Sequence, residues 1–149
     1  MQQYPKSRGS NTMDSVIESK PKIPGEEFSR VALTPEASDL LRLLWGQHGP
    51  LMFHQSGGCC DGSSPMCFPA GEFKTGDADV LLGTFELPDA DGGTLGELDF
   101  WMSREQFEYW KHTKLTVDVV PGRGSGFSVE APEGKRFLIR SEIIAFPGQ

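Results

Sequence analysis

Long apolar runs, clusters of basic residues and paired cysteines are all scarce in this sequence of 149 residues. No stretch reaches the roughly 18 apolar residues of a membrane-spanning helix, and the N-terminus lacks the apolar region of a secretory signal. Lys and Arg number 14 against 21 Asp and Glu, so the net charge is −7, and no basic run offsets it. We therefore expect a cytoplasmic protein that binds neither a membrane nor a nucleic acid.

Cysteine occurs only three times, as Cys59, Cys60 and Cys67. An odd number of cysteines, two of them adjacent, is a poor framework for the disulfides of a secreted protein. In a reducing compartment these residues are expected to be thiols or metal ligands.

The apolar content is large enough for one core. Hydrophobic residues make up 37% of the chain, with three tryptophans and ten phenylalanines, and a chain of this length buries most of its surface on folding. Residues 1–28 are polar and interrupted by prolines, and we expect them to form a disordered tail. Residues 29–149 are then expected to form a single globular domain.

One long helix and one short internal helix are predicted. Thr34 is a plausible N-cap, Pro35 suits the first helical position, and leucines follow until Gly46 or Gly49 ends the helix. The stretch 103–112 starts with a capping box and predicts a second helix of about two and a half turns.

The remaining signals predict strands. Apolar, alternating or β-branched runs occupy residues 50–55, 79–87, 97–102, 115–120, 126–130, 136–140 and 142–146. The second and third of these form a hairpin with a long connection. The expected fold class is α+β, with the N-terminal helix and the internal helix packed on a mostly antiparallel sheet or a partly closed barrel.

All three cysteines lie in one glycine-rich segment with His54. Thiolate sulfur and imidazole nitrogen are ligands for zinc, cuprous copper or iron, and the glycines allow the chain to turn back on itself. We therefore predict a transition-metal site formed by His54, Cys59, Cys60 and Cys67. Neighbouring side chains of an extended segment point apart, so Cys59 and Cys60 can both bind one ion only if the chain turns there. If one of them points away, Asp61 is a candidate oxygen ligand.

Two other interpretations use the same residues. Cys59 and Cys60 could be reactive thiols of an oxidoreductase or of an aldehyde-reactive protein. Alternatively, the cysteines are buried and inert, and the chain is a non-catalytic binding module. A weaker pattern places Glu105, Glu108 and His112 on one helix face, where a solvated surface is the simpler explanation.

Several stretches together resemble the small bacterial proteins grouped as the family DUF779. They are "FHQSGGCCDGSSPMCFPAGEF", "DVLLG", "FEYWKHTKLTVDVVPGRG" and "FSVEAPEGKRFLIRS", and the resemblance covers about residues 35–146. The family is one of unknown function, and its members are often encoded near aldehyde dehydrogenases. The resemblance therefore implies a context of aldehyde or alcohol metabolism, with an aldehyde dehydrogenase as a candidate partner. We expect an accessory role there rather than catalysis by this chain, and a homo-oligomer is a candidate state.

Overall fold

Two mixed β-sheets and two α-helices make up the computed structural model, which describes residues 15–56, 62–122 and 128–144. The five-stranded sheet has the order β2 (Lys20–Pro21), β6 (Asp79–Pro88), β7 (Thr94–Ser103), β4 (Leu51–Gln55) and β5 (Met66–Pro69). The four-stranded sheet has the order β1 (Ile17–Glu18), β3 (Val31–Leu33), β8 (Thr113–Pro121) and β9 (Lys135–Ile143). The helices are α1 (Pro35–His48) and α2 (Arg104–Trp110), with a short 3₁₀ turn η3 (Ala131–Glu133).

The α+β class is confirmed, but the predicted single sheet or partly closed barrel is wrong. The described strands form two separate sheets, and β3–β8 and β4–β7 are parallel pairs. The long helix is also not N-terminal in the fold, because β1, β2 and β3 precede it. Strand pairing depends on contacts between distant residues, and strands of two or three residues carry no periodic signal.

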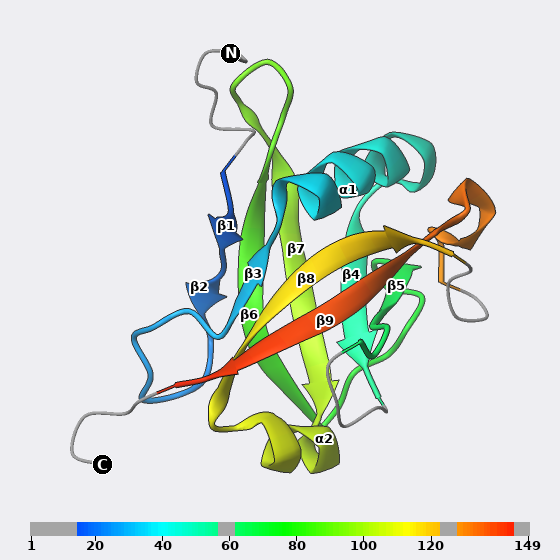
Figure 1. Ribbon diagram of the computed structural model, residues 1–149. Coiled ribbons are helices and arrows are strands. Elements are labelled where there is room, and N and C mark those ends of the chain that lie inside the picture. Colours follow the sequence, from blue (N-terminus) through cyan, green and yellow to red (C-terminus); the bar gives the residue numbers. More distant parts are fainter. Residues whose placement is uncertain (1–14, 57–61, 123–127, 145–149) are drawn as a thin grey trace.

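The two sheets pack face to face around one core. Figure 1 shows β8 and β9 crossing in front of β6, β7 and β4, with α1 near one end of the layers and α2 at the other. The ring of Phe53 on β4 lies edge-on to Phe137 on β9, with ring centroids 5.0 Å apart. Leu41 and Leu44 of α1 join the same cluster. This shared apolar core is what holds the sheets together.

The long helix forms where the sequence predicts it. Thr34 caps α1 by accepting a hydrogen bond from the backbone N–H of Ala37 at 3.1 Å, and Pro35 follows directly. Gly49 ends the helix with a φ of +80°, and its N–H donates to the carbonyl of Trp45. A positive φ favours glycine, so Gly49 rather than Gly46 is the terminator.

Residues 17–21 link the two sheets, although the sequence predicts a disordered tail up to residue 28. β1 pairs with β3 of one sheet and β2 pairs with β6 of the other. Between them Ser19 lies against Gly83, where a Cβ atom would come within 2.4 Å of the Ser19 hydroxyl oxygen. The close approach is possible because residue 83 has no side chain. Residues 1–14 lie outside the described chain.

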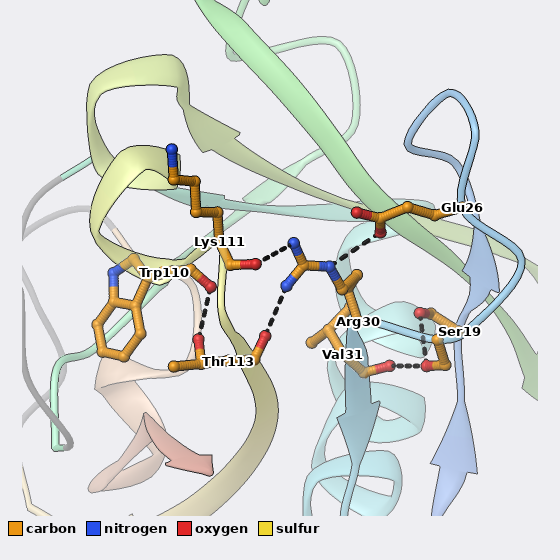
Figure 2. A network of polar contacts seen from close by, with 8 residues as sticks. Ser19, Glu26, Arg30, Val31, Trp110, Lys111 and Thr113 are labelled. Atoms are coloured by element: carbon orange, nitrogen blue, oxygen red, sulfur yellow. Dashed lines mark hydrogen bonds and ion pairs between the residues drawn. The ribbon is translucent and has the colours of Figure 1, made fainter. Parts of the chain in front are cut away.

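A buried arginine, Arg30, joins the N-terminal segment, here residues 17–30, to the chain just after α2 (Figure 2). The guanidinium of Arg30 is 2.9 Å from the Glu26 carboxylate and donates to the carbonyls of Lys111 at 2.6 Å and Thr113 at 2.8 Å. These carbonyls directly follow α2, where a positive charge is favourable next to the helix C-terminus. Arg30 therefore connects β3 to the helix that packs on β6 and β7.

Other predicted elements show a mixed outcome. The β6–β7 hairpin and β8 cover the predicted runs. The predicted strands at 136–140 and 142–146 are one strand, β9, which ends at Ile143; residues 145 and 146 lie outside the described chain. The predicted strand at 126–130 does not form over its described residues 128–130, which lead into η3 instead. α2 ends at Trp110, so His112 lies beyond the helix and the predicted three-residue face is incomplete.

Candidate site around His54

His54 lies on the face of the five-stranded sheet that points away from the core, which we call the outer face. Phe53 points into the core, and because side chains alternate along a strand, His54 points the other way. The segment after β5 covers it, with the ring of Phe73 at 4.2 Å between centroids and Phe68 stacked behind Phe73 at 5.1 Å. His54 is consequently buried although it belongs to the outer face.

Both ring nitrogens of His54 are hydrogen-bonded. Nε2 is 2.7 Å from Oδ1 of Asp79, the first residue of β6, and Nδ1 is 2.7 Å from the hydroxyl of Ser56. Burial raises the pKa of Asp79, but the hydrogen bond from His54, the backbone N–H of Gly76 and the positive charge of Arg104 outweigh it and leave that pKa below its usual value.

The ionised Asp79 carboxylate can only accept a hydrogen bond, so Nε2 of His54 carries the proton in this contact. In the tautomer that is protonated at Nε2 alone, Nδ1 accepts the hydrogen bond from the Ser56 hydroxyl. A carboxylate behind an imidazole fixes the tautomer and the orientation of the ring. Nδ1 can therefore act as a metal ligand or as a base at the end of β4 when the Ser56 hydroxyl moves away from it.

Cys67 lies on the opposite face from His54. It pairs with Phe53 across β4 and β5, and the side chains of such a pair share a face of the sheet. Its thiol is free and fully buried in the core. Burial, together with the nearby negative charge of Glu130, raises the pKa of the Cys67 thiol well above its ordinary value. The structure therefore does not bring His54 and Cys67 together.

Cys59, Cys60 and Asp61, the other predicted ligands, lie outside the described residues. Within residues 15–56, 62–122 and 128–144, no three His, Cys, Asp or Glu side chains are grouped closely enough to hold a metal ion. Glu108 forms an exposed ion pair with Lys111 at 3.1 Å, which agrees with a solvated helix face.

A buried carboxylate next to Cys67 has no counterpart in the sequence predictions. Glu130 is fully buried; the Ser128 hydroxyl donates to its Oε1 and accepts from the backbone N–H of Cys67 at 2.8 Å. Oε2 has no hydrogen-bond partner among the described residues. Burial raises the pKa of Glu130, and the Ser128 hydrogen bond opposes this only in part. The alternation in "FSVE" indicates a strand and conceals this polar cluster.

A groove of about 450 Å³ lies beside His54 on the outer face. Asp99 and Trp101 of β7, Met52 of β4, and Phe73 and Lys74 after β5 line it. Trp101 is the strand partner of His54, and Asp99 is the partner of Met52. Phe73 therefore contacts His54 and also borders the groove.

A second cavity, of about 530 Å³, lies between α1, the end of β8 and the start of β9. Leu40, Leu43 and Val119 form its apolar part, and Glu36 and Asp39 lie at its edge. It is on a different part of the molecule from His54. The groove at β4 and β7 is accordingly the cavity that belongs to the candidate site.

These features define a two-sheet α+β protein with a buried histidine–carboxylate pair next to an open groove. A family model described as a domain of unknown function, DUF779, matches residues 40–143, and the chain therefore belongs to the DUF779 family. Comparison with curated proteins and with solved structures yields no match. Neither described helix is long and apolar enough to cross a membrane.

Proposed function

We propose that this protein binds a soft transition-metal ion, zinc, cuprous copper or iron, at the end of β4. His54 is the ligand through Nδ1, and Cys59 and Cys60, three and four residues after Ser56 in the sequence, supply thiolates. The observation that carries the proposal is the 2.7 Å contact between His54 Nε2 and Asp79. A histidine that binds a metal through one ring nitrogen commonly donates the N–H of the other to a carboxylate in this way.

Cys67 is not part of the proposed site. A metal ligand must be a thiolate, whereas burial keeps Cys67 as a thiol within the core. Two thiolates and one imidazole leave a fourth tetrahedral position open, as in a metal site that exchanges ligands.

The proposed setting is cytoplasmic aldehyde or alcohol metabolism, with an aldehyde dehydrogenase as partner. This part of the proposal depends on the genomic context that the family resemblance implies, which is an association rather than a property of the site.

Metal analysis of protein purified without chelator, then incubated anaerobically with Zn(II), Cu(I) or Fe(II), tests the proposal. We expect stoichiometric metal in the wild type, loss of metal in His54→Gln and in Cys59→Ser, and affinity about 10- to 100-fold lower in Asp79→Asn. Cys67→Ala is the matched control and keeps its metal. Substoichiometric metal in the wild type under all three conditions refutes the proposal. Loss of metal in a folded Cys67→Ala protein refutes the ligand assignment.

Thiol chemistry is a second candidate, favoured by the 2.7 Å contact between His54 Nδ1 and the Ser56 hydroxyl. A nitrogen that accepts this proton is also a base for the thiol of Cys59 or Cys60, in an oxidoreductase or an aldehyde-reactive protein. Thiol labelling against pH separates the candidates. An activated cysteine titrates well below the usual thiol pKa of about 8.5 and returns towards it in His54→Gln.

A further inference from the structure

The groove beside His54 combines a carboxylate with aromatic walls. Asp99 and Trp101 are two residues apart on β7 and therefore project from the same face of the sheet. Phe73 closes the side nearest β5, and Met52 lies across from Asp99. A volume of about 450 Å³ is within the range of small-molecule sites.

Asp99 has no cationic partner in the described part of the chain. Its Oδ1 accepts a hydrogen bond from the Thr84 hydroxyl at 2.7 Å, and this is its one hydrogen bond among those residues. Lys20 pairs with Glu97 at 3.3 Å and with Glu86 at 3.8 Å instead. Lys74 lines the groove without an ion pair to Asp99. The neutral hydroxyl holds the half-buried carboxylate in place but does not neutralise its charge.

We propose that this groove binds a small organic ammonium compound. The ammonium group lies on the carboxylate of Asp99 beside the rings of Trp101 and Phe73, where cation–π attraction adds to the ion pair. The apolar part of the ligand packs on Met52. An anion in the same place would meet two carboxylates, those of Asp99 and Glu97, against one lining cation, Lys74.

The inference does not depend on the proposed metal function. The ring of Phe73 contacts His54 at a tilt of 35°, so a ligand in the groove contacts the ring that covers the proposed metal ligand. Binding in the groove itself uses none of His54, Cys59 or Cys60. The two proposals can therefore fail separately.

Isothermal titration calorimetry of the full chain with benzylamine, benzyl alcohol and benzoate tests the inference, because the three compounds share a ring and differ in charge. We expect benzylamine to bind and the other two to bind at least tenfold more weakly. Asp99→Asn keeps an acceptor for Thr84 and removes the charge, and should weaken benzylamine binding by about 10- to 100-fold. Trp101→Leu should weaken it by about 2- to 30-fold.

Glu86→Gln is the matched control, since Glu86 is an exposed acid near Lys20 that does not line the groove. It should leave the benzylamine affinity unchanged within twofold. The inference is overturned if benzyl alcohol or benzoate binds as tightly as benzylamine. It is equally overturned if folded Asp99→Asn binds like the wild type, or if benzylamine does not bind.

Discussion

Replacing the buried Arg30 by methionine should destabilise the protein by about 3 kcal/mol. The guanidinium is almost fully buried and makes hydrogen bonds of 2.9, 2.8 and 2.6 Å to Glu26, Thr113 and Lys111 (Figure 2). A hydrogen bond to a charged group contributes about 1.5–3 kcal/mol. Glu26 is 20% exposed and can recover hydration, and methionine retains part of the apolar contact, so the expected loss is well below the full sum.

Urea unfolding followed by circular dichroism measures this loss, and thermal unfolding should show Tm lower by about 6–12 °C. Arg104→Met is the matched control. The Arg104 guanidinium is exposed and contacts one carbonyl, that of Asp77, at 3.2 and 3.3 Å, so its loss should change stability by less than about 0.5 kcal/mol. If Arg30→Met and Arg104→Met lie within about 1 kcal/mol of each other, Arg30 does not connect the N-terminal segment to α2 as we argue.

Two further substitutions test the interior. Burial raises the pKa of the Glu130 carboxyl above its usual value, so the folded state binds the carboxyl proton more tightly than the unfolded state does. Wild-type stability therefore falls as pH rises between the unfolded and the folded pKa of Glu130. Glu130→Gln keeps an acceptor for Ser128 and should gain stability relative to the wild type as pH rises from about 4 to 8 in urea unfolding; a difference that is constant with pH contradicts this. Gly83→Ala places a methyl group within 2.4 Å of the Ser19 hydroxyl oxygen and should cost about 1–3 kcal/mol, with faster proteolysis of the N-terminal segment. Gly93→Ala is its control, because a Cβ atom at residue 93 meets nothing within 4 Å. Equal stability of the two variants would show that β2 does not need the close approach of Ser19 to residue 83.

Local signals predicted the elements whose causes are local. Thr34, Pro35 and Gly49 occupy the cap positions of α1 because capping requires atoms only a few residues away. Ser103 caps α2 for the same reason. The hairpin of β6 and β7 follows from two alternating runs and a turn in which Gly92 has a φ of +94°.

The predicted site was recoverable only in part. His54 was identified by its residue type, but its partner Asp79 is 25 residues further along the chain and meets it through the assembly of β4, β7 and β6. The predicted set of metal ligands assumed that residues close in sequence meet at one point. Cys67 instead points into the core, because it pairs with Phe53. No sequence pattern identified the buried Glu130 or the groove at Asp99.

The sequence by itself determined the family, the two helices with their caps, the β6–β7 hairpin and the residue types available for chemistry. Each of these depends on composition or on side chains within a few positions of one another. Only the tertiary structure decided that there are two sheets, that His54 faces Asp79 and that Cys67 is buried in the core. The physical reason is that the register of a strand sets which side chains reach the core, and that register is chosen by the burial of apolar side chains from strands distant in the chain.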